Sequence, residues 1–127
     1  MAAARVLIVE DEIPLAALLR QAFENEGFEV STARDGIDCM NKVASYRPDV
    51  IIMDIMMPKL DGVDATRLIR RNRHFRDTVI VALSARSDPG TRQQMREAGA
   101  NLFMRKPFVI GKLVQRVRQL LGIGQQI

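Results

Sequence analysis

The sequence has few of the residues on which several classes of site depend. It contains one cysteine, Cys39, which excludes an internal disulfide and a metal cluster built from several cysteines. It has no tryptophan and one tyrosine, so an aromatic platform for stacking nucleic-acid bases is poorly supplied. No apolar run approaches the ~20 residues of a membrane-spanning helix. The first apolar run is short and is followed at once by acidic residues, unlike a signal peptide. These absences favour a cytoplasmic domain that does not enter a membrane.

The length and composition fit one folded domain. The chain has 127 residues, of which 47% are hydrophobic and 27% charged, and we expect a single domain over 1–127 with its core at about 5–121. The net charge is +4, but it is unevenly distributed. Residues 1–66 carry 6 basic and 12 acidic residues, whereas residues 67–127 carry 13 basic and 3 acidic ones. A basic excess is compatible with nucleic acid or with an acidic partner, and it does not choose between them.

Five short segments have the composition of β-strands. The runs at 6–9, 50–53 and 79–83 are continuously apolar and mostly β-branched, which is typical of strands buried on both faces of a parallel sheet. Residues 28–32 alternate in polarity and predict an edge strand, and 102–104 predict a short fifth strand.

Apolar residues recur at helical spacing in the segments between and after these strands. The predicted apolar stripes include Leu18 in the first helix, Ile37 in the second and Leu68 in the third. Asp88-Pro89 predicts the start of the fourth helix, and Gly99 predicts its end. Strands that alternate with helices predict an α/β fold, a doubly wound parallel sheet of five strands flanked by five helices.

Polar side chains follow the buried strands of this predicted sheet. Glu10 and Asp11 follow the first strand, Asp54 the third, Ser84 the fourth, and Lys106 lies just beyond the fifth. Ligands of open α/β sheets bind outside the carboxyl ends of the strands, so we expect these five side chains to converge.

The residue types at this edge indicate phosphoryl chemistry. Three carboxylates at close range either raise a pKa or hold a cation, and hard oxygen ligands suit Mg²⁺ or Mn²⁺. A lysine and a hydroxyl suit an anion, so the set predicts phosphoryl transfer onto a carboxylate. Neither of the glycine-rich phosphate-binding motifs occurs, so a nucleotide-hydrolysing site lacks its phosphate cradle.

Four segments in the same order and spacing carry a resemblance to a known family. Residues Val9–Glu12, Asp54–Gly62, Leu83–Ala85 and Lys106–Phe108 resemble the motifs of the CheY-like response-regulator receiver domains of two-component signalling. The resemblance extends from about Val6 to Leu121. It implies a flavodoxin-like sheet with the strand order 2-1-3-4-5, and a protein with no enzymatic activity beyond its own phosphorylation and dephosphorylation.

The resemblance also implies a phosphoacceptor and a metal site. Asp54 resembles the aspartate that accepts a phosphoryl group from a sensor histidine kinase or a phosphotransfer protein. Asp11 and Asp54, together with the backbone carbonyl of Met56, resemble the direct Mg²⁺ ligands. Glu10 resembles the second acidic residue, which acts through water.

A second group of residues resembles the switch of the family. Lys106 resembles the lysine that pairs with the phosphoryl group, and the Lys106-Pro107 peptide is expected to be cis. Ser84 resembles the hydroxyl that moves onto a phosphoryl oxygen. Phe103 resembles the aromatic residue that turns inward behind it. The switch is expected to change the face formed by the fourth helix, the fifth strand and the fifth helix.

The basic excess suggests the chemistry of an output partner, which we expect to be acidic. Much of the excess lies on the predicted signalling elements, at Arg86, Arg92, Arg96, Arg105, Lys112, Arg116 and Arg118. In receivers attached to winged-helix DNA-binding domains, acidic residues near the start of the fifth strand pair with basic residues across a dimer. Asn101 and Leu102 stand at those positions, so we expect a monomer or a weak dimer.

Other functions remain open at this point. The chain could be a constitutive interaction module of receiver fold, or the receiver piece of a longer DNA-binding regulator. Direct nucleic-acid binding is suggested by Arg67, Arg70, Arg71, Arg73 and Arg76, but no recognition motif accompanies them, so we do not expect it. A hydrolase of related fold is the weakest reading.

Overall fold

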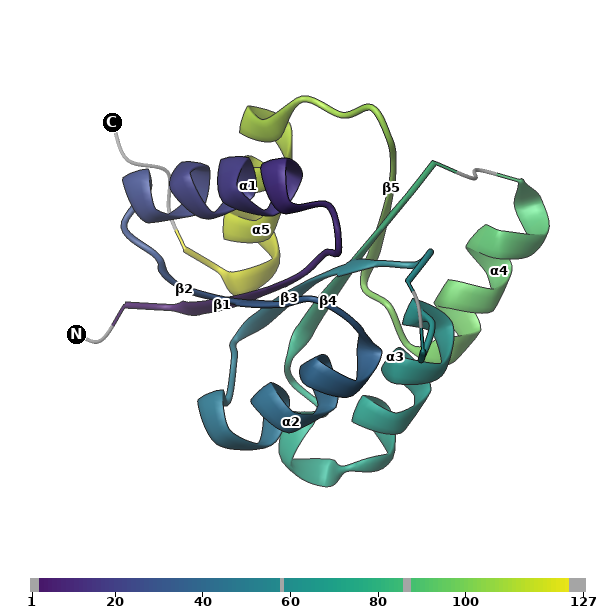
Figure 1. Ribbon diagram of the computed structural model, residues 1–127. Helices are drawn as coiled ribbons and strands as arrows, with labels where there is room; N and C mark the ends of the chain where they lie inside the picture. The colour runs from purple at the N-terminus through teal and green to yellow at the C-terminus, as the bar shows by residue number, and fades with distance from the viewer. Residues whose placement is uncertain (1–2, 58, 86–87, 124–127) are drawn as a thin grey trace.

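A five-stranded parallel sheet forms the centre of the molecule (Figure 1). The computed structural model describes residues 3–57, 59–85 and 88–123. Its strands are β1 (Arg5–Val9), β2 (Glu29–Ala33), β3 (Val50–Asp54), β4 (Val79–Ser84) and β5 (Leu102–Arg105). They lie side by side in the order β2-β1-β3-β4-β5, which confirms the predicted topology.

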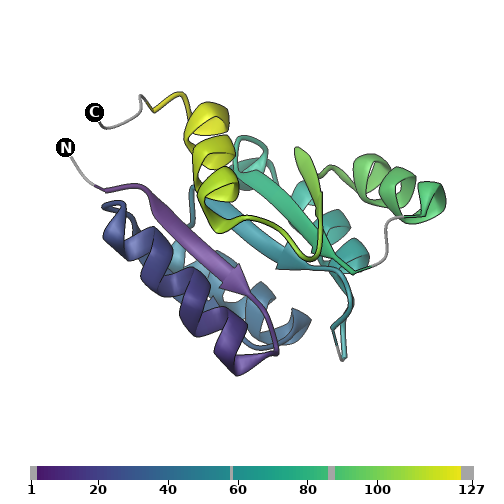
Figure 2. The same cartoon turned by 90° about the horizontal axis from the view of Figure 1, so that it is seen from above.

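Helices connect the strands and cover both faces of the sheet. They are α1 (Ile13–Asn25), α2 (Gly36–Tyr46), α3 (Gly62–Arg71), α4 (Pro89–Ala98) and α5 (Ile110–Leu121), with a 3₁₀ turn, η1 (Arg73–Phe75), before β4. Figures 1 and 2 show α1 and α5 on one face and α2 and α3 on the other, with α4 beside α3 and β5. In the described part of the chain, no helix combines the length and apolar character needed to cross a membrane.

The alternation of side chains along each strand divides the apolar interior into two layers. Val6 and Ile8 of β1 pack with Phe23 of α1 and Leu113 of α5. Leu7, between them, points to the opposite face and joins the core beneath α2 and α3. Both faces of β1 and β3 are therefore covered, which is why these strands are continuously apolar.

The structure corrects three positions of the predicted helical stripes. Leu18, Ile37 and Leu68 were expected on the core-facing sides of α1, α2 and α3, but all three are exposed. Each of these helices packs against the sheet on one side only, so residues at the edge of its apolar stripe stay in contact with solvent.

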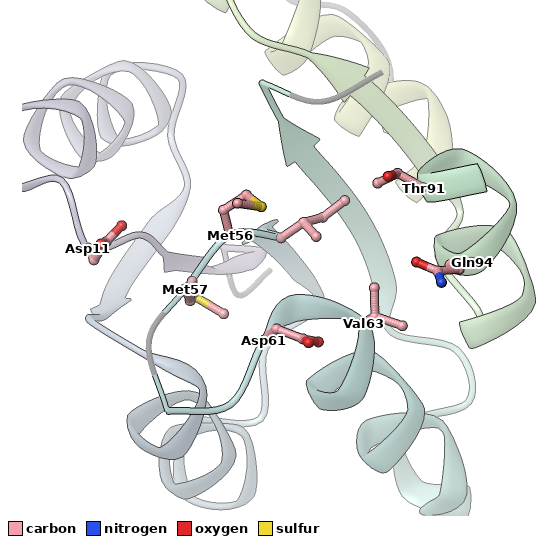
Figure 3. Close-up of a pocket in the computed structure, with 8 residues that line it drawn as sticks. Asp11, Met56, Met57, Asp61, Val63, Thr91 and Gln94 are labelled. Atoms are coloured by element: carbon pink, nitrogen blue, oxygen red, sulfur yellow. The ribbon is translucent and has the colours of Figure 1, made fainter. Parts of the chain in front are cut away.

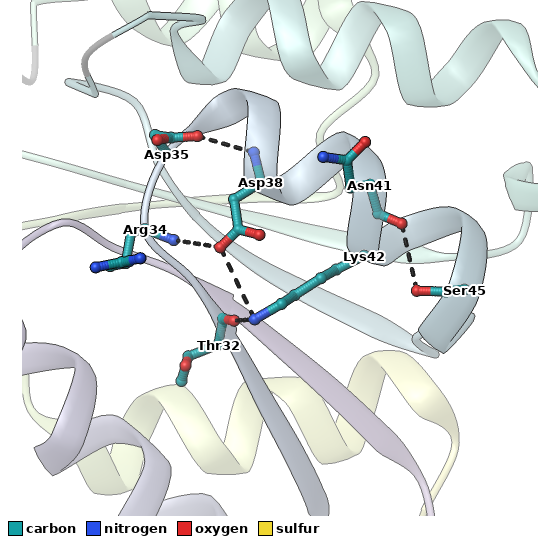
Figure 4. Close-up of polar contacts among 7 residues, drawn as sticks. All are labelled: Thr32, Arg34, Asp35, Asp38, Asn41, Lys42 and Ser45. Carbon is teal, nitrogen blue, oxygen red and sulfur yellow. Dashed lines mark hydrogen bonds and ion pairs between the residues drawn. The ribbon is translucent and has the colours of Figure 1, made fainter.

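Aspartates fix the starts of the helices on the other face. Asp35 accepts a hydrogen bond from the backbone N–H of Asp38 (2.8 Å), which begins α2 beside the end of β2 (Figure 4). The Asp38 carboxylate in turn contacts Lys42, whose ammonium donates to the Thr32 carbonyl (Figure 4). Asp61 begins α3 in the same way, by accepting from the backbone N–H of Asp64 (2.9 Å).

The predicted boundaries of α4 are confirmed. Asp88 accepts from the Thr91 backbone N–H (3.0 Å), with Pro89 as the first helical residue. Gly99 ends the helix at a φ of 115°, a left-handed conformation that glycine adopts without strain.

Gly62 brings the start of α3 close to the end of β3. A Cβ atom at this position would lie 2.7 Å from the backbone oxygen of Asp54 and 2.8 Å from the Cα atom of Ile55. The Gly62 N–H donates to the Ile55 carbonyl (3.0 Å), which fixes the same approach. Since both obstructing atoms belong to the backbone, a side chain here would displace the residue that follows the strand.

We therefore expect Gly62→Ala to lower the free energy of unfolding by about 1–3 kcal/mol, because the added methyl group is forced into backbone atoms. Urea denaturation of the variant and the parent protein measures this difference. The matched control is Gly111→Ala in α5, where a Cβ would meet no atom within 4 Å. Its free energy of unfolding should stay unchanged or rise by up to about 1 kcal/mol. Equal stabilities of the two variants would contradict the steric argument.

Candidate functional site

The carboxyl ends of the strands bring the predicted polar residues together at one edge of the sheet. Glu10 follows β1 directly, Asp54 is the last residue of β3, and Ser84 is the last residue of β4. Because β1 and β3 are neighbours, with Val9 opposite Met53, Glu10 and Asp54 lie side by side. Glu10, Asp54 and Ser84 are buried, with 3%, 4% and 0% of their surface exposed.

Lys106 reaches this edge from the loop after β5 and joins the two buried acids. Its Nζ lies 3.0 Å from Glu10 Oε1 and 3.4 Å from Asp54 Oδ2. The Lys106 backbone N–H donates to the Ser84 carbonyl (2.8 Å), so the parallel pairing of β4 and β5 continues to this residue. The Lys106-Pro107 peptide is cis, as predicted.

The shared lysine does not remove the electrostatic cost of burying two carboxylates. Burial raises the pKa of Glu10 to about 7, the hydrogen bond from Lys106 lowers it, and the charge of Asp54 raises it again. Burial also disfavours the charged form of Lys106, but the hydrogen bond to Glu10 and the charges of Asp54 and Glu10 outweigh it, so the pKa of Lys106 lies above its ordinary value.

Three carboxylates form a cluster that suits a hard cation. One ligand oxygen from each of Glu10, Asp11 and Asp54 can be chosen such that all three lie within 4.8 Å of one another. Asp11 is exposed, whereas the other two are buried, so the cluster is open to solvent on one side. An open, all-oxygen donor set of this kind fits Mg²⁺, which retains several water ligands in protein sites.

A pocket of about 580 Å³ lies beside the acidic cluster (Figure 3). It is lined by Asp11, Ile55, Met56, Met57, Asp61, Val63, Thr91 and Gln94. Figure 3 shows Asp11 at one side of the pocket and the α4 residues Thr91 and Gln94 at the other. The contribution of α4 could not be predicted from the sequence, because no motif or spacing indicates how close α4 lies to the loop after β3.

The loop after β3 is held to the site by hydrogen bonds that its backbone N–H groups donate. The Met56 N–H donates to Asp54 Oδ1 (3.3 Å), and the Ile55 N–H donates to the Leu83 carbonyl (3.0 Å). Met56 itself is exposed and lines the pocket. Asp54 therefore has its two carboxylate oxygens in different surroundings, one near a backbone donor and one near Lys106.

Phe103 lies half-buried between α4 and the sheet. It packs against the small cluster formed by Ile55, Ala82 and Met95, among others. The Arg92 guanidinium lies over its ring, with the carbon 4.8 Å from the ring centroid, which is cation–π geometry. No sequence pattern indicated this contact.

The buried Cys39 has no place in the site. It lies in the core between α2 and the sheet, and burial raises the pKa of its thiol to about 12. The thiol is therefore protonated at neutral pH, as expected for a packing residue rather than a redox sensor.

Comparison with known proteins agrees with this geometry. The family model of the response regulator receiver domain matches residues 6–118. The chain belongs to this family. The Transcriptional regulatory protein PrrA of Mycobacterium leprae is 43% identical over 117 residues, which are 92% of this chain and 49% of that protein. The chain thus spans about half the length of the curated relatives that it matches.

Two solved receiver structures show the same fold. The chemotaxis protein CheY4 of Vibrio cholerae is 30% identical with a TM-score of 0.89, and the match covers 94% of this chain and 99% of that one. The receiver domain of the sensor histidine kinase PA1611 of Pseudomonas aeruginosa is 32% identical with a TM-score of 0.87, over 95% and 99% of the two chains. The latter structure has a magnesium ion coordinated in its active-site cleft.

The raised pKa of Glu10 predicts how stability depends on pH. Between the ordinary value of 4.5 and the native value of about 7, the native state keeps a proton on Glu10 that the unfolded state has lost. The native state therefore binds more protons, and the free energy of unfolding falls as the pH rises through this range, by about 1–3 kcal/mol. Glu10→Gln should remove most of this fall.

Urea denaturation at several pH values, in buffer with a chelator to exclude bound cations, measures the effect. The matched control is Glu12→Gln at an exposed position, which should keep the pH dependence of the parent protein. A full pH dependence in Glu10→Gln would show that another group causes it.

Proposed function

We propose that this receiver domain accepts a phosphoryl group on Asp54 from a phosphohistidine and thereby switches the binding of an output partner. The observation that carries the proposal is the contact of one ammonium group, that of Lys106, with both Asp54 and Glu10. The third acid of their cluster, Asp11, lines a pocket. A site of this kind presents a carboxylate nucleophile together with a cation for the incoming phosphoryl oxygens.

The transfer itself requires few groups. An Asp54 oxygen attacks the phosphorus atom, the phosphorus–nitrogen bond of the donor breaks, and the electron pair of that bond leaves with the histidine. Lys106 then pairs with a phosphoryl oxygen, and the Met56 N–H next to Asp54 Oδ1 is a further donor at the same place. This chain supplies the nucleophile and these donors, whereas the phosphoryl group comes from the partner.

The acidic cluster is proposed to hold a divalent cation, with Asp11, Asp54 and the Met56 carbonyl as direct ligands and Glu10 acting through water. The chemistry supplied there by bound Mg²⁺ is neutralisation of charge on the carboxylates and on the incoming phosphoryl oxygens. The exposed position of Asp11 and the buried positions of Glu10 and Asp54 support this assignment, because the cluster combines fixed ligands with access for water.

Phosphorylation is proposed to act on the switch residues through local charge. A phosphoryl group adds about −1.5 to −2 charges and strong acceptor oxygens beside Lys106 and Ser84. A state in which Ser84 donates to this group, and Phe103 turns inward behind it, gains contacts that the unphosphorylated state lacks. The equilibrium therefore shifts toward it.

A phosphodonor assay tests the transfer. Incubation with Mg²⁺ and acetyl phosphate should add the mass of one phosphoryl group, and Asp54→Asn should abolish the gain because the nucleophile is lost. The matched control, Asp77→Asn, changes an exposed aspartate outside the site and should keep the gain. Intact-protein mass spectrometry measures all three. No gain in the parent protein would overturn the proposal, and turnover of an external phosphate ester would favour a hydrolase.

Exposed apolar residues support a protein, rather than a small molecule, as the natural phosphodonor. Ile13, Met56 and Val109 are 73%, 56% and 61% exposed, and they follow β1, β3 and β5 at the same edge of the sheet as Asp54. Apolar side chains around a polar pocket are typical of a surface that a partner covers. We propose that a sensor kinase or a phosphotransfer protein contacts these residues, in the cytoplasm.

We expect the single variants Ile13→Gln and Val109→Gln each to lower the rate of phosphoryl transfer from a phosphorylated histidine phosphotransfer domain by about tenfold. This is the effect of losing an interface contact worth ~1.4 kcal/mol. Labelling by acetyl phosphate should stay unchanged, since this donor needs no protein contact. Leu68→Gln, which removes a 39% exposed apolar side chain from the seventh residue of α3, away from the strand ends, is the control and should match the parent protein in both assays. Equal slowing with both donors would place the defect in the phosphorylation site instead.

The structure weakens the case for nucleic-acid binding through the arginines near the end of α3. Arg70 donates to the Gly99 carbonyl (2.9 Å), the Phe75 carbonyl (2.8 Å) and Asn101 Oδ1 (2.8 Å), so its guanidinium is committed within the molecule. Arg67 contacts the Asp64 carboxylate (3.3 Å). The output is therefore proposed to pass through protein contacts. The relatives that are named as transcriptional regulators are about twice as long as the region that matches this chain.

Basic residues expected on the signalling elements differ in their availability. Arg118 is buried; it donates to the backbone carbonyl of Glu26 (2.7 Å) and contacts the Glu26 carboxylate (3.1 Å), which corrects its predicted place on a binding surface. Arg105, Lys112 and Arg116 are exposed, and Arg86 lies outside the described residues.

A further inference from the structure

The loop between β3 and α3 forms one wall of the pocket beside the acidic cluster. We call its described residues, 55–57 and 59–61, the β3–α3 loop. Met56, Met57 and Asp61 of this loop line the pocket (Figure 3), and the Met56 carbonyl is one of the proposed cation ligands. The conformation of the β3–α3 loop therefore decides where this ligand lies relative to the carboxylates.

Two hydrogen bonds to one carbonyl group fix the base of the β3–α3 loop. The Ile55 carbonyl accepts from the Met57 N–H (3.2 Å) and from the Gly62 N–H (3.0 Å). Ile55 is itself buried directly after β3, so both ends of the loop are tied to the sheet. The tip of the loop, Lys59 and Leu60, is positioned by a different element, α2.

The tip rests on Gly36, the buried first residue of α2. A Cβ atom on Gly36 would lie 2.1 Å from the Leu60 carbonyl oxygen and 2.5 Å from the Leu60 Cβ atom. The backbone of Gly36 is not left-handed, so it is the lack of space, and not the conformation, that requires glycine here. The Asp35 cap fixes the start of α2, so an added side chain would displace the tip of the loop rather than the helix.

An ion pair joins the tip to the same turn of α2. The Nζ atom of Lys59 lies 3.5 Å from Asp35 Oδ2, while Asp35 Oδ1 accepts the hydrogen bond that begins the helix. Lys59 has a φ of 69°, a left-handed conformation that costs energy for a residue with a side chain. Such a conformation persists only where its surroundings impose it. Here they are the fixed base of the loop and its contact with α2.

We propose that the first turn of α2 supports the β3–α3 loop and thereby sets the affinity of the cation site. Gly36 is the positioning residue, and the Asp35–Lys59 pair is a tether. The support acts through Leu60 on a loop whose base is fixed, so a displaced tip turns the Met56 carbonyl away from the acidic cluster. This inference rests on the cation assignment of the proposed function.

Isothermal titration calorimetry with Mg²⁺ on the unphosphorylated protein tests the role of Gly36. We expect Gly36→Ala to weaken Mg²⁺ binding by about tenfold, the effect typical of losing the outer support of a metal ligand. Labelling by acetyl phosphate should fall at low Mg²⁺ concentration and recover at saturating Mg²⁺, because Asp54 and Lys106 are unchanged. Equal Mg²⁺ affinities of Gly36→Ala and the parent protein would overturn the proposal.

The matched control is Gly111→Ala, which adds the same methyl group to the first turn of α5. A Cβ atom there would meet no atom within 4 Å, so Mg²⁺ affinity should stay within about twofold of that of the parent protein. An equal loss of affinity in the two variants would overturn the steric argument. Circular dichroism checks that both variants fold.

Charge variants test the tether and do not depend on the stability of Gly36→Ala. By charge alone, Asp35→Asn should weaken the binding of a cation, Lys59→Gln should tighten it, and the double variant should match the parent protein. Loss of the tether instead predicts weaker Mg²⁺ binding by the double variant, by about threefold, since a solvent-exposed ion pair contributes little. Asn still caps the helix. An unchanged affinity of the double variant would overturn the role of the ion pair.

Amide hydrogen exchange, followed by NMR in the presence of a chelator, tests the support without any cation. Gly36→Ala should speed the exchange of the Met57 and Gly62 N–H groups, whereas Gly111→Ala should not. Faster exchange with unchanged Mg²⁺ affinity would overturn the proposal, because the loop would then not position the ligand. A parent protein that binds no Mg²⁺, while Gly36→Ala still speeds exchange, would defeat the cation assignment of the proposed function and not the support itself.

Discussion

The rest of the site depends on one ammonium group that is shared by two buried carboxylates. Glu10 and Asp54 follow adjacent parallel strands, so the fold itself forces like charges together at the sheet edge. Lys106 offsets this repulsion from the far side of β4, at 3.0 and 3.4 Å. The compensation is incomplete, since the pKa of Glu10 still rises to about 7 with burial as the main cause. Removing one partner from such a buried cluster leaves an uncompensated charge, which is why its members depend on one another.

The incomplete balance also makes the site responsive to added charge. The Nζ atom of Lys106 lies closer to Glu10 than to Asp54, so new negative charge on Asp54 would compete with Glu10 for the same ammonium group. Lys106 is bound to the end of β4 through the Ser84 carbonyl, and it follows the strand that carries Phe103. Any change in the contacts of Lys106 therefore occurs at the ends of β4 and β5, and β5 packs against α4.

Much of the fold and the centre of the site could be predicted from the sequence, because they follow from local rules. Continuous β-branched runs predicted the buried strands, and the polar residue after each strand predicted Glu10, Asp54 and Ser84 at one edge. Contacts that depend on the angle and distance between helices could not be predicted. The exposure of Leu18, and the place of Thr91 in the pocket beside the acidic cluster, depend on how far each helix turns and tilts on the sheet. No spacing along the chain records that geometry.

The charge asymmetry of the sequence takes on a different meaning once the contacts are known. In the acidic half, residues 1–66, most of the proposed function depends on three carboxylates at one edge of the sheet. The basic half, residues 67–127, is not a uniform cationic surface. Arg70 and Arg118 bind backbone carbonyls within the molecule, so they stabilise the packing of α3 and α5 rather than attract a partner. Arg92 and Arg96 on α4, in contrast, line a pocket together with apolar residues. The net charge of a domain therefore says little about its partner until the internally bound charges are subtracted.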